Sequence, residues 1–286
     1  MIKVLSHGFC YDGISAAWVA WKVFGDKAQY TPCVYGNPLP QIEKGDEVYI
    51  LDFSFPRQVL LDWEKICKKI VLLDHHRTAE ADLKGLPFVT FNMEKSGALL
   101  AYEYFYPNKP TPWLIQHVSD RDLWKFKLDK SRAFHSYLKS HRFDFKIWDE
   151  INNEMESGQE ARDLIYAKGE AIEKYQNQIV QNTVDGFSWV GYLDRHRVAI
   201  CNATCDWSEI GEYLLKKFPD VEFSVSYWDT ADGKRQYSLR SNSDFDVSEF
   251  AKTKGGGGHA KAAGFILPID KAPVIRARLS TKGDMV

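Results

Sequence analysis

The chain has 286 residues, 44% of them hydrophobic and 27% charged, a composition typical of a soluble globular protein with room for two domains. Its 37 basic and 39 acidic residues leave a formal net charge of -2, so no overall positive field exists to hold a long nucleic acid through counterion release. A ligand that carries phosphate would instead need local hydrogen-bond donors or metal ions.

The sequence also predicts the compartment. Its apolar runs are shorter than a membrane span, and the first residues lack the basic-then-apolar pattern of a signal peptide. The five cysteines are an odd number in a chain of this size, which argues against a disulfide scaffold and for a reducing compartment. Cys201 and Cys205 have no second Cys/His pair nearby, which argues against a zinc ribbon. We therefore expect a cytoplasmic protein without a membrane segment.

Strand and helix signals alternate in the first half of the chain. Short apolar runs predict strands, and stretches with helical periodicity lie between them. Asp12 stands where it would cap the first helix. Such alternation predicts βαβ units, and hence a mainly parallel sheet flanked by helices. The expected strands cover residues 2–5, 47–51 and 69–73, and the expected helices cover residues 12–24, 59–67 and 96–106.

The second half begins with a polar stretch that predicts one long helix, from residue 158 to residue 184. Ser157 and Glu160 have the spacing of a capping box at its start. Short strand signals follow, and they predict a smaller α+β domain. Its expected strands cover residues 187–193, 197–203, 221–228, 235–241 and 265–267, and its helix covers residues 208–218. The predicted division is a catalytic domain over residues 1–155, a linker helix over 156–185 and a C-terminal domain over 186–286.

Polar residues stand where the first three predicted strands end. In open α/β sheets, ligands bind in the crevice outside the carboxyl ends of the strands. Three successive strands with this feature therefore predict one shared site. The residues are His7, Cys10 and Asp12 after the first strand, Asp52 after the second, and Asp74, His75 and His76 after the third.

Carboxylates brought together in this way would repel one another unless a cation lay between them. The set of candidate acids is Asp12, Asp52, Asp74 and Asp120. Because histidines accompany them, Mn²⁺, Zn²⁺, Fe²⁺ or Co²⁺ fits better than Ca²⁺, which prefers oxygen alone. Two such ions would activate water and clamp a phosphoryl oxygen. The alternative is that Asp12 only caps its helix and that residues 74–76 form a solvated turn, but the set as a whole favours a metal site.

Four consecutive glycines, residues 255–258, lie near the C-terminus and are followed by His259. They allow a flexible linker, but a strand signal follows at once, and linkers rarely interrupt a packed unit. Backbone N–H groups of successive glycines can form a nest for an anion, helped by an adjoining helix N-terminus. Arg240 offers a planar donor fork suited to phosphate, with a surface ion pair to Asp244 or Asp246 as the alternative.

Two motifs together carry a resemblance to a known family. They are VLLDHH at residues 71–76 and GGGGHAKAAGF at residues 255–265. In this order and at this distance, they resemble the DHH phosphoesterase superfamily with its DHH-associated C-terminal domain. This two-domain arrangement is shared by single-strand exonucleases, nano-RNases, cyclic-dinucleotide phosphodiesterases and exopolyphosphatase-like proteins. The resemblance covers most of the chain.

The resemblance implies roles for the matching residues. Asp52 would bridge two metal ions, and His76 would face the substrate phosphate. Asp122 is a weaker candidate for a ligand than its neighbour Asp120. The implied metal ligands are His7, Asp12, Asp52, His75 and Asp120, and the implied catalytic residues are Asp52, Asp74 and His76. The implied substrate-binding residues are Arg240, Ser241, Gly256, Gly257, Gly258 and His259.

The first-strand motif departs from the family pattern at one position. The usual motif has two aspartates, one residue apart, before the glycine, whereas HGFCYDG places Cys10 at the first of them. A thiolate is a softer ligand, which would favour Zn²⁺ or Fe²⁺ over Mn²⁺ if Cys10 binds metal. If Cys10 does not bind, one of the two metal sites is weak. We include Cys10 among the ligands and expect one or two divalent ions, Mn²⁺ first, with Zn²⁺, Fe²⁺, Co²⁺ or Mg²⁺ as alternatives.

The expected activity is metal-dependent hydrolysis of phosphodiester bonds in short oligonucleotides or in linear or cyclic dinucleotides. The balanced charge favours a short substrate, because a processive nuclease would show a basic channel lined with aromatic residues. A hydrolase of polyphosphate or pyrophosphate is one alternative. A nucleotide-binding regulator without catalysis is another, and a homodimer stays open.

Overall fold

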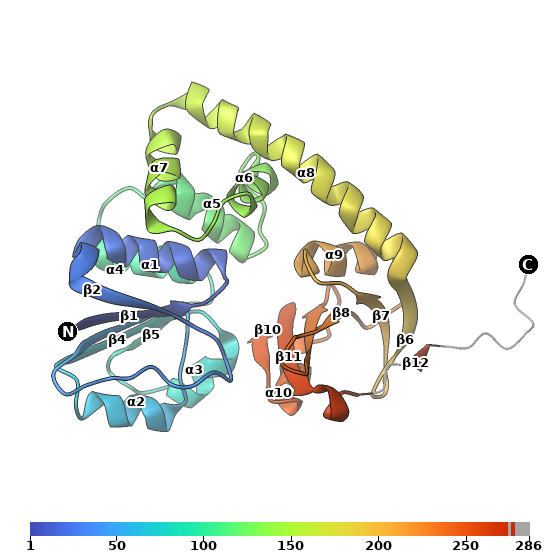
Figure 1. Cartoon of the computed structure of the whole chain (residues 1–286), viewed down its shortest axis with the longest axis horizontal. Helices are drawn as coiled ribbons and strands as arrows, with labels where there is room; N and C mark the ends of the chain where they lie inside the picture. Colours follow the sequence, from blue (N-terminus) through green and yellow to red (C-terminus); the bar gives the residue numbers. More distant parts are fainter. Residues whose placement is uncertain (274–275, 278–286) are drawn as a thin grey trace, which may run out of the picture. The chain divides into compact units, whose positions relative to one another are not determined.

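The computed structural model describes residues 1–273 and 276–277. The chain forms two compact units, one from Met1 to Lys174 and one that begins at Tyr175. The boundary falls inside one long helix, α8 (Gln159–Phe187) (Figure 1). Ile165 and Tyr166 from its first half belong to the core of the first unit, and Val180 and Val184 from its second half belong to a core of the second.

The first unit is built on a five-stranded sheet in which all neighbouring strands are parallel. Continuous apolar sequence makes β3 and β4 central strands, because parallel strands are buried on both faces. The predicted parallel sheet is confirmed, but both edge strands, β2 and β5, escaped prediction. In sheet order the strands are β2 (Ala28–Cys33), β1 (Ile2–His7), β3 (Glu47–Leu51), β4 (Lys69–Asp74) and β5 (Val89–Phe91).

Helices cover both faces of this sheet (Figure 1). One face of the sheet packs on α1, α4 and α5 through a large apolar cluster that also includes α6 and α7, and the other face packs on α2 and α3. The helices are α1 (Tyr11–Phe24), α2 (Arg57–Glu64), α3 (Arg77–Leu83), α4 (Gly97–Phe105), α5 (Trp113–Asp122), α6 (Ser131–Lys139) and α7 (Phe145–Glu156). A 3₁₀ turn (Gly25–Lys27) follows α1.

Two predicted helix caps differ in the structure. Asp12 does not cap its own helix, since α1 already begins at Tyr11 and its N-cap residue is Cys10. The predicted capping box at α8 is also wrong. Ser157 is instead the C-cap residue of α7, and its hydroxyl donates to the Glu154 carbonyl at 2.8 Å. The long helix itself is confirmed.

The second unit holds a seven-stranded mixed sheet, which confirms the predicted α+β domain. Among the described strands, β7 and β8 pair in parallel and the other neighbours are antiparallel. In sheet order the strands are β10 (Gly257–His259), β11 (Ala262–Pro268), β9 (Lys234–Arg240), β8 (Phe223–Asp229), β7 (His196–Asn202), β6 (Ser188–Leu193) and β12 (Arg276–Ala277). Its helices are α9 (Trp207–Lys217) and α10 (Val247–Thr253), and a 3₁₀ turn (Ile269–Lys271) follows β11.

Candidate metal centre

The parallel register places three titratable residues side by side at the carboxyl edge of the first sheet. Leu51 of β3 is paired with Ser6 of β1 on one side and with Leu73 of β4 on the other. The next residue of each strand is therefore His7, Asp52 and Asp74, at adjacent positions. Asp52 has a left-handed backbone with φ 55°, and its N–H donates to the Leu73 carbonyl at 2.9 Å. This conformation turns the chain back over the strand ends, and the Asp52 side chain is fully buried there.

Asp52 lies between two histidines. Its Oδ1 is 3.1 Å from Nε2 of His75, and its Oδ2 is 3.6 Å from Nδ1 of His7. The two oxygens of one buried carboxylate thus face different partners. A carboxylate placed in this way could hold a cation on each side.

Two further carboxylates surround His75. Its Nε2 lies 3.6 Å from Oδ2 of Asp12 and 3.4 Å from Oδ2 of Asp122. Asp12 also accepts hydrogen bonds from the backbone N–H groups of Gly97, at 2.5 Å, and Ala98, at 3.0 Å. Asp12 therefore caps α4, a helix that begins 85 positions further along the chain, and the positive end of that helix stabilises its charge.

Gly97 allows this arrangement because a larger residue would not fit. A Cβ atom on Gly97 would lie 2.3 Å from the Cβ of Asp52. The first turn of α4 thus reaches the cluster of Asp12, Asp52, His75 and Asp122 only because this position has no side chain. Ser96 caps the same helix by accepting a hydrogen bond from the Leu99 N–H at 3.3 Å.

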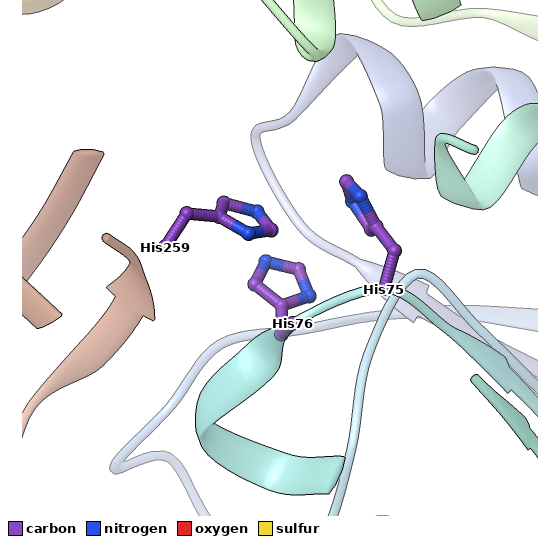
Figure 2. Close-up of side chains that lie close together, drawn as sticks. All are labelled: His75, His76 and His259. Carbon is purple, nitrogen blue, oxygen red and sulfur yellow. The ribbon is translucent and has the colours of Figure 1, made fainter. Parts of the chain in front are cut away.

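Asp74 holds His76 rather than facing outward. Its Oδ1 lies 2.7 Å from Nδ1 of His76 and also accepts from the backbone N–H groups of His75 and His76. Its Oδ2 accepts from the Ser54 hydroxyl at 2.5 Å. Figure 2 shows the two histidine rings on successive residues after β4, with centroids 5.0 Å apart. Since both oxygens of Asp74 are occupied, the structure places Asp74 as a residue that orients His76.

The structure brings Asp122, rather than Asp120, to the cluster. Asp120 points to the loop that follows α5, where its carboxylate accepts from the backbone N–H groups of Lys127, at 2.9 Å, and Leu128, at 3.1 Å. Two positions apart on a helix means about 200° of rotation, so the two aspartates face opposite sides of α5. This corrects the predicted position of Asp120 and leaves Asp122 as the candidate ligand from this helix.

Cys10 lies beside His7 and Asp52 at the start of α1. Ligand atoms of these three residues lie within 4.8 Å of one another. Burial, and then the charge of Asp52, raises the pKa of the Cys10 thiol, while a hydrogen bond with His7 lowers it in part. A metal ion bound here would have to displace the thiol proton.

The electrostatics of the cluster favour bound positive charge. Burial, and then the charges of Asp122 and Asp52, raises the pKa of Asp12 well above its usual value, and burial also raises the pKa of Asp122. Burial alone would raise the pKa of Asp52 too, but the nearby imidazoles of His7 and His75 lower it. Burial would lower the pKa of His75, yet Asp52 and Asp122 raise it to about 11. Without a cation, the cluster therefore retains protons.

The residues present fit a pair of divalent ions. Among the residues that the structure describes, Asp52 Oδ2, Asp122 Oδ2 and His7 Nδ1 are buried polar atoms without a hydrogen-bond partner. Buried polar atoms are rarely left unpaired, so this group of atoms fits the binding of a cation. Three groups of donors in the first unit are close enough together to hold an ion: His7, Cys10 and Asp52; Asp12, His75 and Asp122; and Asp52, Asp74 and His76. Both oxygens of Asp74 already accept hydrogen bonds, so we take the first two groups as the donor sets, with Asp52 between them.

The glycine run of the second unit forms a hairpin strand rather than a nest at a helix N-terminus. It follows the C-terminal end of α10, and the N–H groups of Gly255 and Gly256 donate to the carbonyls of Lys252 and Ala251, which close that helix. The strand β10 then pairs with β11, with His259 opposite Ala262. A Cβ atom on Gly256 would lie 2.1 Å from the Gly264 carbonyl oxygen, so close packing explains this glycine.

Arg240 ends β9, the strand next to this hairpin. Its guanidinium donates to the Leu239 carbonyl and to the hydroxyls of Ser238 and Ser208, at 2.7, 3.1 and 2.7 Å. Ser241 is buried, and its N–H donates to the Lys261 carbonyl in the turn between β10 and β11. Arg240, Ser241 and His259 thus belong to one small region of the second unit.

Comparison with known proteins indicates the family of the chain. Residues 198–282 match the DHHA1 domain family. The chain is 32% identical over 284 residues to an uncharacterized protein of Acanthamoeba polyphaga mimivirus, and 30% identical over 216 residues to the oligoribonuclease NrnB of Bacillus subtilis (strain 168). The chain belongs to the DHH phosphoesterase superfamily.

The coverage of these relatives is partial. The matches include 91% and 68% of this chain, but they span only 66% of the mimivirus protein and 52% of NrnB. The crystal structure of RecJ from Thermus thermophilus in complex with Mn²⁺ has the same fold, with a TM-score of 0.50 at 13% identity. That match covers 92% of this chain and 49% of RecJ. Within the described residues, no helix has both the length and the apolar character to span a bilayer.

Two residues of the candidate site, Gly97 and Ser54, are not predicted from the sequence, because their roles depend on contacts with Asp52 and Asp74. Asp122 is predicted only as the weaker candidate, since the order of two aspartates in the sequence does not show which one faces the sheet. For Gly97, the available signal is a glycine at the start of a predicted helix.

Proposed function

We propose that this DHH protein hydrolyses phosphodiester bonds of short oligonucleotides or dinucleotides with the help of divalent metal ions. The observation that carries the proposal is the buried Asp52 carboxylate, whose two oxygens face His7 and His75 at 3.6 and 3.1 Å. The donor sets on either side of Asp52 would hold the ions, Mn²⁺ being our first choice. When bound, such ions polarise a phosphoryl oxygen and lower the pKa of water.

His76 is the residue best prepared to act on the substrate. Asp74 occupies its Nδ1 at 2.7 Å and so orients the ring with Nε2 directed away from Asp74. In its charged form, His76 would donate from Nε2 to a phosphoryl oxygen or to the leaving oxygen. Asp74 acts by orienting this ring, in the manner of the carboxylate that supports a catalytic histidine.

The second unit would bind the rest of the substrate. Arg240 offers a guanidinium, and the β10–β11 hairpin offers His259. The name of the NrnB relative, an oligoribonuclease, supports short RNA as the substrate class. The net charge of -2 supports a short substrate too, because long nucleic acids are held mainly by excess positive charge.

The test is a panel of substrates with Mn²⁺: pApA, RNA of five nucleotides, and polyphosphate. We expect turnover of the first two, and two manganese ions per chain by elemental analysis. Asp52→Asn should lower turnover by at least about 100-fold, because loss of a group that only supports a ligand already costs about 10- to 100-fold. Asp62→Asn, at an aspartate whose side chain is 56% exposed on α2, is the matched control. Hydrolysis of polyphosphate alone, or tight binding of pApA without turnover, would contradict the proposal.

A further inference from the structure

Phe9 has an unusual position for a large apolar residue. It is 86% exposed, and it lies at the tip of the turn between β1 and α1. His7 lies two positions before it and Cys10 directly after it, and both belong to the candidate metal centre. An exposed aromatic residue therefore lies within two sequence positions of residues that would bind the ions.

The backbone at Phe9 is strained. Its φ is 56°, in the left-handed region that glycine and asparagine adopt readily and that bulky residues rarely adopt. A turn selected only for stability would carry glycine here. Strained residues concentrate at functional sites, where the surrounding structure imposes the conformation.

The surrounding structure holds this turn on both sides. The N–H of Gly8 donates to the Cys33 carbonyl at 2.7 Å, which ties the turn to the end of β2. The carbonyl of Cys10 accepts from the Ile14 N–H at 3.0 Å and so belongs to the first turn of α1. A Cβ atom on Gly13 would lie 2.1 Å from the His7 carbonyl oxygen, so α1 packs directly on the end of β1. The Phe9 ring is thus presented on a rigid turn.

A second exposed aromatic residue, Tyr35, lies beside His7. Tyr35 is 51% exposed, and its ring centroid lies 6.0 Å from that of His7. It stacks on Phe53, with centroids 4.3 Å apart and an interplanar angle of 25°. Phe53 directly follows Asp52 and is buried, so Tyr35 has a firm support beneath one face of its ring.

We propose that Phe9, with Tyr35 as a second platform, stacks on a nucleobase next to the phosphate that is cleaved. Every base has a π face, so such a contact tolerates different sequences and yet separates nucleotides from polyphosphate, which has no ring. An aromatic ring on a rigid turn is suited to this task, because the turn loses little conformational entropy when the base binds. The proposal rests on the phosphodiesterase function proposed above and adds the feature by which the enzyme would select nucleotides.

The experiment compares pApA with an abasic analogue that has the same sugars and phosphates. Wild-type protein with Mn²⁺ should show a higher kcat/KM for pApA. Phe9→Ala should reduce kcat/KM for pApA roughly 5- to 100-fold, the range expected for loss of one stacked base, and leave the abasic analogue unchanged. Phe9→Trp should keep the preference. Tyr104→Ala, at an aromatic residue that is 40% exposed near the far end of α4, is the control.

A glycine variant separates stacking from folding. Phe9→Gly relieves the backbone strain, so it should raise the melting temperature while it lowers turnover of pApA as Phe9→Ala does. A dinucleotide that contains 2-aminopurine gives an independent readout on the Asp52→Asn variant, which should bind it without turnover. Its fluorescence should be quenched on binding with Phe9 present and less so with Phe9→Ala.

The outcomes distinguish the two proposals. If the wild type hydrolyses pApA and its abasic analogue equally well, the enzyme activity stands and the base contact is refuted. An unchanged ratio of the two rates in Phe9→Ala refutes it as well. If the wild type hydrolyses neither substrate, the phosphodiesterase function fails, and the quenching of 2-aminopurine by Phe9 then decides the base contact alone.

Discussion

Replacing Asp120 and Asp122 separately tests which aspartate of α5 belongs to the metal centre. Asp122 Oδ2 lies 3.4 Å from His75 Nε2, whereas Asp120 accepts two backbone hydrogen bonds from the loop after α5. Asp122→Asn should therefore weaken Mn²⁺ binding by at least about 100-fold, more than the loss of a supporting group. Asp120→Asn should change Mn²⁺ affinity by only a few-fold.

The two variants should also differ in stability without metal. Asparagine at position 120 keeps one acceptor oxygen, so one of the two N–H groups that Asp120 binds would face an amide NH₂ instead. Because Asp120 is only 7% exposed, the lost bond should cost about 1–3 kcal/mol. Burial raises the pKa of Asp122, which means that its charged form destabilises the metal-free fold. Asp122→Asn should thus leave the metal-free protein as stable as the wild type, or more so.

Calorimetric titration with Mn²⁺ and thermal unfolding in EDTA measure these two effects on the same samples. The loop after α5 holds Trp124, Phe126 and Lys130 at positive φ, a conformation that costs free energy. Because the Asp120 carboxylate holds this loop in place, we expect Asp120→Asn to lower stability. If Asp120→Asn abolishes Mn²⁺ binding at full stability while Asp122→Asn still binds, our assignment of Asp122 is refuted.

Three further variants test other parts of the structure. Cys10→Asp should raise the affinity for Mn²⁺ relative to Zn²⁺, because an oxygen ligand replaces a soft thiolate; equal ratios in competition titrations would show that Cys10 binds no metal. Gly97→Ala should lower the free energy of unfolding by about 1–3 kcal/mol or more and weaken Mn²⁺ binding, because its Cβ would lie 2.3 Å from that of Asp52. The control Gly186→Ala has open space around its Cβ and should change neither quantity. Burial lowers the pKa of His117 to about 4, below its usual 6.5. The stability that neutral His117 contributes should therefore be lost as the pH falls from about 6.5 to about 4, by about 3 kcal/mol in all, and urea unfolding of His117→Gln should show a smaller pH dependence.

The parallel sheet and its strand-end residues were predictable because both follow from local sequence. An apolar run such as that of β3 or β4 is typical of a strand buried on both faces, and the helical stretches between the runs require parallel order. The edge strand β2 was not predictable in this way. It is half-exposed, and it contains Pro32, which an edge position tolerates and a central strand does not.

Contacts between segments distant in the sequence determine the partners of the other candidate residues. Asp12 has the sequence position of a local helix cap, and only the fold shows that it caps α4 instead. The four glycines fit a nest or a linker equally well in sequence. Their place in a hairpin follows from the pairing of β10 with β11, and from the approach of Gly264 to within 2.1 Å of a Cβ at Gly256. The sequence pattern thus indicates which residues follow the strand ends and turns, but not which neighbours they contact.

The charge balance of the first unit links these contacts to function. Asp12, Asp52 and Asp74 are almost completely buried, and Asp122 lies beside them. Ser54 and His76 form hydrogen bonds with Asp74, and the start of α4 donates to Asp12. In contrast, Asp52 Oδ2 and Asp122 Oδ2 have no hydrogen-bond donor in the described part of the chain. A buried carboxylate oxygen without a donor costs stability, and it persists when something outside the protein chain satisfies it. Because one of these oxygens belongs to each donor set, the same argument favours positive charge on both sides of Asp52, which is the arrangement that the proposed cleavage of a phosphodiester with two metal ions would use.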